Sequence, residues 1–203
     1  MPNRQVGSEV GRDFHTARSK EPPIVDPEEF LARPFQGIEA GRLATAPDIE
    51  FLRWLPTLKN ETGLVLLKPD WYIIKGSSVG IPSWIIPPKS DVLLHSHPSD
   101  GEDKTCVRAF PSLGDFFNGL PTARNLIASP FGITQYFPIE DDRGRTAVEA
   151  EITAFSPRFN TARDTTEYLR FLEDVGARYE IHPWDRIDGQ KLRDMLEPGI
   201  ERI

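Results

Sequence analysis

The stretch 91–98 constrains the fold of this chain more than any other. Its first half, Asp91-Val-Leu-Leu94, is rich in aliphatic residues and is typical of a short buried strand. Because side chains alternate along a strand, His95 and His97 should project from one face while Ser96 points away from it. Two of the 4 histidines of the chain therefore converge on one point near the end of a strand.

A third kind of ligand follows in the segment Ser112-Leu-Gly-Asp115. This segment predicts the start of a helix, and the Asp115 carboxylate can reach the same point as the two imidazoles. It also fits a capping box, in which Ser112 is the N-cap and Asp115 accepts from a backbone N–H, and the two interpretations are compatible. Two imidazole nitrogens, one carboxylate oxygen and an open fourth position are typical of a catalytic zinc site. We therefore expect His95, His97 and Asp115 to bind Zn²⁺.

A carboxylate that could carry protons lies upstream of these ligands. Glu61 precedes Thr62, Gly63 and an apolar run that ends at Leu67, and such a run is typical of a buried strand. A carboxylate at the entrance to a buried strand is costly unless it has a function. The alternative is that Glu61 belongs to an ordinary solvated turn between a helix and the strand.

These three elements, in this order, resemble the signature of the JAMM (MPN-plus, JAB-domain) zinc metalloproteases. That signature is Glu, then His-Ser/Thr-His-Pro, then Ser-x-x-Asp, and the resemblance covers roughly residues 48–155. It implies that Glu61 is the general base and acid, and that Ser112 hydrogen-bonds the developing oxyanion. The interval between Pro98 and Ser112 is longer than is usual in that family.

The resemblance also implies a fold and an activity. The fold would be α/β, a JAB/MPN-like (cytidine-deaminase-like) layered domain with a central mixed sheet flanked by helices. The activity would be hydrolysis of a peptide or isopeptide bond, with the C-terminus of a ubiquitin-like protein as the candidate substrate. Two alternatives stay open: a non-catalytic scaffold with the same fold, and a DNA-associated protein similar to the RadC branch.

Rival metal sites fail because the chain lacks their ligands. Zinc nucleobase deaminases need a Pro-Cys-x-x-Cys pair, but Cys106 is the single cysteine of the chain. Hydrolase barrels with a His-x-His motif need several further histidines downstream, and only His182 follows.

Composition restricts the partners and the compartment. A net charge of −7 and a pI near 5.2 argue against a nucleic-acid binder, and a mean hydropathy of −0.40 argues against a membrane protein. One cysteine cannot form an internal disulfide, so we expect a cytoplasmic protein. The partner implied by the resemblance is a protein or peptide substrate. The oligomeric state is left open.

The length of 203 residues and the pattern of elements divide the chain into three parts. We expect a flexible tail over 1–24, a metalloprotease domain with an N-terminal helical extension over 25–160, and a C-terminal helical extension over 161–203. The periodicity predicts helices at 26–33, 48–56, 113–120, 164–177 and 189–196, and strands at 63–68, 71–75, 91–94, 125–130 and 132–137, with 147–155 as a strand or a short helix.

Two further segments are candidates for substrate contacts. The segment 81–88 contains three prolines, which exclude a central strand and favour an edge segment or a loop. We expect its Trp84 to border a groove that holds an extended peptide. The loop 99–110 joins the histidines to the helix of Asp115. Its polar first half and apolar second half predict a lid or specificity loop whose tip moves and whose second half is fixed.

Overall fold

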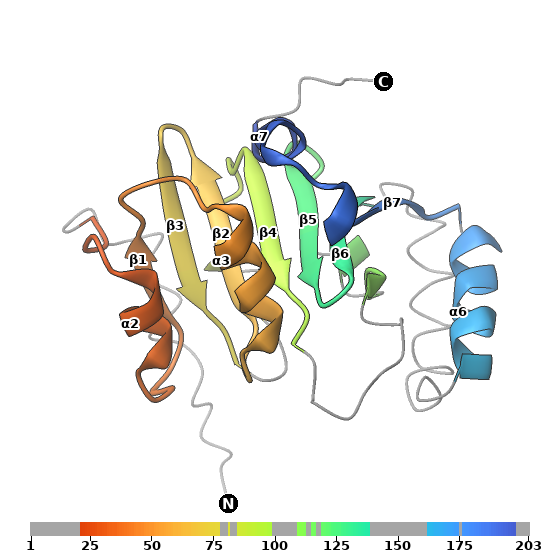
Figure 1. Ribbon diagram of the computed structural model, residues 1–203, viewed down its shortest axis with the longest axis horizontal. Coiled ribbons are helices and arrows are strands. Elements are labelled where there is room, and N and C mark those ends of the chain that lie inside the picture. Colours follow the sequence, from red (N-terminus) through yellow and green to blue (C-terminus); the bar gives the residue numbers. More distant parts are fainter. Residues whose placement is uncertain are drawn as a thin grey trace, which may run out of the picture.

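The computed structural model describes residues 21–77, 81, 85–98, 109–112, 115–116, 119–138, 162–174 and 176–197. Within these residues the chain forms a single mixed sheet with helices packed on it (Figure 1). The helices are α2 (Pro27–Ala32), α3 (Ile49–Trp54), α6 (Ala162–Asp174) and α7 (Gly189–Leu196), with 3₁₀ turns η1 (Leu55–Thr57) and η4 (Trp184–Arg186). The strands are β1 (Glu39–Arg42), β2 (Thr62–Leu67), β3 (Asp70–Lys75), β4 (Val92–Ser96), β5 (Arg124–Ser129), β6 (Gly132–Phe137) and β7 (Arg178–Pro183).

The 7-stranded sheet has the order β1-β3-β2-β4-β5-β6-β7. Strands β4 and β5 are parallel, and the other neighbouring pairs of these strands are antiparallel. The central strands β2, β4 and β5 are buried over almost their whole length, as expected for strands covered on both faces. The α/β class expected from the sequence is confirmed.

One face of the sheet is covered by α2, α3 and α7, which lie in front of the strands in Figure 1. Alternate residues of β2 and β4, such as Leu64 and Leu94, point into this face and are fully buried. They pack against Leu52 of α3, Leu55 of η1 and Met195 of α7. This layer is the main hydrophobic core.

The opposite face holds two smaller clusters. The first contains Val65 and Leu93 of the central strands, packed against Ile85 and Ile86. The second joins β5 and β6 to α6, and its members are aromatic or aliphatic: Phe116, Ile127, Tyr136, Tyr168 and Leu172. Because His95 lies two residues after Leu93, its side chain points to this second face.

The starts of the first two helices agree with the predictions from the sequence. Asp26 accepts a hydrogen bond from the Glu29 N–H at 2.8 Å, and Asp48 accepts one from the Phe51 N–H at 2.8 Å. Each aspartate satisfies a backbone donor that has no partner within the helix. Pro56 lies in the 3₁₀ turn that follows α3, so the expected stop near this proline is confirmed.

Strands β1 and β7, at the two ends of the strand order, were not predicted. β1 is a four-residue strand containing a glycine, and β7 alternates between exposed and partly buried side chains, so neither carries an apolar run. β7 belongs to the segment 161–203, which was expected to hold helices. Pro23 and Ile24, which were assigned to the tail, pair with Arg42 through backbone contacts.

The helix expected over 164–177 differs at both ends. The sequence Asp164-Thr-Thr-Glu167 favours a helix that begins at Asp164, but α6 begins at Ala162, so Asp164 is its third residue. Alanine and arginine favour helix, which explains the earlier start. The helix ends at Asp174, and Gly176 follows with φ 68°, a left-handed conformation that glycine adopts without strain.

Several expected features lie outside the described residues. These are the element at 147–155, Trp84, Cys106 and most of the loop 99–110. Of the helix expected over 113–120, Asp115 and Phe116 are described and are helical. None of the helices in the described parts of the chain is long and apolar enough to cross a membrane.

Candidate metal centre

The two histidines lie at the C-terminal end of β4, on the face opposite the main core. His95 is directly opposite Gly63 of β2 and is paired with Ile127 of β5. Ser96 between the histidines is fully buried, and its Oγ accepts a hydrogen bond of 2.9 Å from the Thr62 N–H. This bond ties the end of β4 to the start of β2, so the alternation expected from the sequence is present and the local backbone is held in place.

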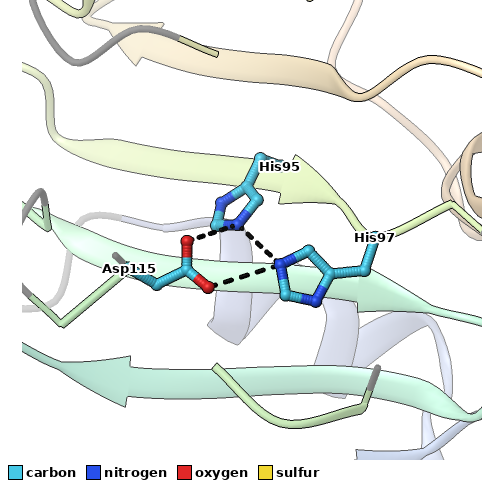
Figure 2. A group of neighbouring side chains, drawn as sticks. All are labelled: His95, His97 and Asp115. Carbon is cyan, nitrogen blue, oxygen red and sulfur yellow. Dashed lines mark hydrogen bonds and ion pairs between the residues drawn. The ribbon is translucent and has the colours of Figure 1, made fainter. Parts of the chain in front are cut away.

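Asp115 reaches the histidines from a helical turn. The Ser112 N–H donates to Asp115 Oδ2 at 2.6 Å, and the Asp115 N–H donates to Ser112 Oγ at 3.2 Å. The capping box predicted for these two residues is therefore confirmed, with its serine and aspartate bonded reciprocally. Figure 2 shows the carboxylate pointing toward both imidazole rings.

The segment that leads into this turn is anchored by side chains from two other elements. Thr134 of β6 donates its hydroxyl to the Ala109 carbonyl oxygen at 2.5 Å. Tyr168 of α6 donates its hydroxyl to the Pro111 carbonyl oxygen. Both donors are buried, so the position of Asp115 depends on β6 and α6 as well as on its own capping box.

The three side chains have the spacing of ligands around one small cation. His95 Nε2 is 3.0 Å from Asp115 Oδ1, His97 Nε2 is 3.3 Å from Asp115 Oδ2, and the two Nε2 atoms are 3.2 Å apart (Figure 2). Ligand atoms about 2.1 Å from a tetrahedral zinc ion are separated by about 3.4 Å. The cluster therefore has nearly the dimensions of three corners of a zinc site.

Burial strengthens the electrostatics of this cluster. The side chains of His95, His97 and Asp115 are 10%, 12% and 15% exposed. Burial by itself lowers the pKa of His95, but the charge of Asp115, the hydrogen bond to it and the charge of Glu61 together raise that pKa above 6.5. Burial by itself raises the pKa of Asp115, but the charges of the two histidines and their hydrogen bonds hold it well below 3.8. Asp115 is therefore an anion at neutral pH, as a metal ligand must be.

Glu61 lies beside the same cluster. It lines a cavity of about 60 Å³ together with His95, Asp115, Gly63 and Tyr136. Its backbone is held at the start of β2, because the Glu61 N–H donates to Ser77 and the Glu61 carbonyl oxygen accepts from Gly76. The carboxylate expected to carry protons is thus brought to the cluster by the antiparallel pairing of β2 with β4.

The glycine at position 63 leaves space beside His95. Directly opposed residues of antiparallel strands have their Cβ atoms about 5 Å apart, so a side chain here would face the imidazole. A Cβ on Gly63 would also lie 2.8 Å from Ile81 Cδ1. The cavity therefore depends on the absence of a side chain at this position.

Of the other residues predicted for the site, Ser112 is exposed and does not line this cavity. Its hydroxyl oxygen accepts the capping bond from Asp115. Trp84, expected to border a substrate groove, lies outside the described residues. Glu50, another carboxylate upstream of the histidines, is on α3, where it pairs with Arg53, and it does not line this cavity.

Tyr136 lines the cavity but was not predicted as a site residue. It is 2% exposed, and its ring meets His95 edge-on with centroids 6.3 Å apart. Burial, the charge of Asp115 and the charge of Glu61 raise its pKa well above 10.0, so the phenol stays neutral. The sequence offered no local signal for it, because its place in the site depends on how β6 and β5 pair with β4.

The donor set fits a divalent metal ion. His95, His97 and Asp115 are a group of the described residues whose potential ligand atoms all lie within 4.8 Å of one another. Two neutral nitrogens and one carboxylate oxygen suit zinc, and three protein ligands leave a position for water or substrate. The geometry defines a candidate metal centre in an α/β protein with a carboxylate close by.

Comparison with known proteins adds no further assignment, since no family model, curated protein or solved structure matches this chain.

Proposed function

We propose that this chain is a zinc-dependent metallopeptidase that hydrolyses a peptide or isopeptide bond. The observation that carries the proposal is the small cavity that Glu61 shares with His95 and Asp115. A metal centre with only structural ligands has no need of an additional carboxylate beside its open side. A hydrolytic centre does need one, because a proton must leave the attacking water and reach the leaving group.

The resemblance to the JAMM metalloproteases supports the same proposal. Glu61, the His95-Ser96-His97-Pro98 stretch and the Ser112-x-x-Asp115 stretch occur in the order of that signature. In this chain they come from β2, from β4 and from the helical turn after Pro111, and they meet on one face of the sheet. We therefore propose a JAB/MPN-like fold for the domain.

The residues divide the chemical work between binding and proton transfer. His95, His97 and Asp115 would hold the zinc ion, which when bound polarises a carbonyl group and lowers the pKa of a water molecule. Glu61 would take a proton from the attacking water and deliver it to the leaving amine nitrogen. Leu93, Ile74 and Ile86 also line the cavity and restrict access of bulk water to it.

The proposed substrate is a protein or peptide, and the resemblance suggests the C-terminal tail of a ubiquitin-like protein. The net charge of −7 favours a neutral or basic partner over a nucleic acid. The single cysteine favours a cytoplasmic location.

A metal-exchange experiment tests the function. The protein is stripped with a chelator, reloaded with zinc, and incubated with a library of unmodified peptides and with a set of ubiquitin-like precursors. We expect cleavage by the zinc-loaded protein, none by the stripped protein, and none by zinc-loaded Glu61→Gln. Zinc binding without cleavage of any amide substrate would instead favour a scaffold role for this fold.

A further inference from the structure

Tyr136 is buried and lines the cavity, and the JAMM resemblance assigns no role to this residue. It lies on β6 and points to the same face as His95. Its ring is nearly perpendicular to the His95 ring, at 84°, and to the Phe116 ring, at 80° with centroids 5.8 Å apart. These edge-to-face contacts hold the ring from two sides.

The third side of the ring is closed by Gly119, which follows the helical turn of Asp115. A Cβ atom added at Gly119 would lie 3.1 Å from Tyr136 Cε2 and 3.0 Å from the Asp115 carbonyl oxygen. The phenol end of the ring therefore lies against the turn that carries the carboxylate. It also lies within the electrostatic reach of both Asp115 and Glu61.

The Tyr136 hydroxyl forms no hydrogen bond with any group in the described parts of the chain. A completely enclosed side-chain atom without a hydrogen-bond partner does occur in the described parts of the chain, but it is Arg42 Nε and not the Tyr136 hydroxyl. The Tyr136 hydroxyl is therefore not completely enclosed and borders open space. Tyr136 lines the cavity that Glu61, His95 and Asp115 share, and we place the hydroxyl toward that cavity. Because buried phenols nearly always have a hydrogen-bond partner, a group bound in the cavity is the natural acceptor.

We propose that Tyr136 is a catalytic residue whose hydroxyl donates a hydrogen bond to the carbonyl oxygen of the bound substrate and to the oxyanion that develops from it. This inference rests on the proposed amide hydrolysis and deepens it by naming the donor. The resemblance assigns that role to Ser112. In this chain Ser112 is exposed and its oxygen accepts the capping bond from Asp115, whereas Tyr136 lines the cavity.

The substitution Tyr136→Phe tests the donor, because it keeps both ring contacts and removes only the hydroxyl. We expect kcat to fall about 100-fold with KM changed less than about twofold, as for the loss of one oxyanion donor. Zinc content should stay at the wild-type level. Tyr72→Phe, on β3 and outside the cavity lining, is the matched control and should behave as the wild-type protein does.

A second readout does not depend on turnover. Acetohydroxamate carries a carbonyl oxygen that can bind beside the metal, and its affinity for the zinc-loaded protein can be measured by calorimetry. We expect its dissociation constant to rise about tenfold in Tyr136→Phe, which corresponds to the loss of one hydrogen bond to a charged group. Ser112→Ala, made in parallel, should change this constant less than Tyr136→Phe does.

The outcomes separate this inference from the proposed function. A Tyr136→Phe variant with wild-type kcat and wild-type acetohydroxamate affinity would overturn the inference alone, as would loss of zinc from this variant. Zinc uptake and acetohydroxamate binding without amide cleavage would overturn the proposed function. In that case the acetohydroxamate affinities of Tyr136→Phe and the wild-type protein would still show whether Tyr136 donates the hydrogen bond.

If Tyr136→Phe failed to fold, the wild-type protein labelled with 3-fluorotyrosine would give the answer. The chain has 4 tyrosines, so the Tyr136 signal can be assigned with the other three Tyr→Phe variants. That signal should shift when acetohydroxamate binds to the zinc-loaded protein. An unshifted signal would overturn the inference.

Discussion

Tyr168 and Pro111 are 57 residues apart in the chain, yet the hydroxyl of the first donates to the carbonyl oxygen of the second. Tyr168 is 4% exposed and packs against Phe116, which follows Asp115 directly. α6 therefore contacts the segment of Asp115 in two ways: through the hydrogen bond to the Pro111 backbone, and through packing against Phe116 in the core. A helix outside the candidate ligand group thus helps to position Asp115.

The variant Tyr168→Phe tests this positioning role. It removes the bond to Pro111 while keeping the ring, so we expect the free energy of unfolding to fall by about 1 kcal/mol. Zinc affinity should fall about tenfold, in line with the effect of removing groups that orient ligands without binding the metal. Competition with a fluorescent zinc chelator measures the affinity, and urea unfolding measures the stability.

Tyr179→Phe is the control for this prediction, because Tyr179 also lies near the segment but its ring meets Phe110 without a comparable bond to Pro111. Equal zinc affinity in Tyr168→Phe and in the wild-type protein would show that the capping box alone positions Asp115.

The histidines should account for the bound metal. We expect the purified protein to hold close to one zinc ion per chain, as measured by mass spectrometry of the metal. His95→Ala or His97→Ala should weaken binding by more than about 100-fold, because each removes a direct ligand. His182→Ala, which removes a buried histidine of β7, should keep the zinc. Full zinc content in a His95/His97 double variant would refute the site.

Glu61 should be needed for turnover and not for metal binding. Glu61→Gln keeps the size of the side chain and removes its ability to accept a proton, so kcat should fall by about 10²- to 10⁴-fold. Zinc content should be unchanged. Glu50→Gln on α3 is the control and should retain full activity. An active Glu61→Gln enzyme would mean that another group carries the proton.

Zinc should stabilise the protein more as the pH rises from 5.5 to 8. The pKa of His95 is raised in the metal-free fold, so its ion pair with Asp115 contributes stability at low pH that is lost as the pH rises through that pKa. Protons compete with zinc for the same imidazole over this range, whereas Asp115, with its pKa held well below 3.8, stays ionised.

The measurement is the difference in Tm with and without zinc across this pH range. The difference should be small at pH 5.5 and grow toward pH 8 in the wild-type protein. It should be absent at every pH in His95→Ala. A difference that is largest at pH 5.5 would contradict the prediction.

Local patterns in the sequence were sufficient for several features of the site. The alternation of β4 places His95 and His97 on one face and Ser96 on the other. The reciprocal bonds of Ser112 and Asp115 follow from a four-residue motif. Each of these features depends on residues within one turn or one strand, which is why the sequence alone could predict them.

Features that depend on pairing between distant segments could not be predicted in this way. β1 and β7 lack apolar runs of their own and are strands because β3 and β6 offer hydrogen-bonding edges. The start of α6 was misplaced because a favourable Asp164 capping pattern competes with residues before it that also favour helix. Local preferences are weak compared with the contacts that the folded chain makes.

The sequence by itself therefore determined the ligand types of the candidate metal centre and the α/β class, because both are encoded in short periodic segments. The tertiary structure decided which other groups face those ligands. Gly63 lies opposite His95, and Tyr136 reaches the same cavity, only because β2, β5 and β6 adopt one particular register around β4. A shift by one residue would turn each of these side chains to the other face, and only packing of the whole sheet selects the register.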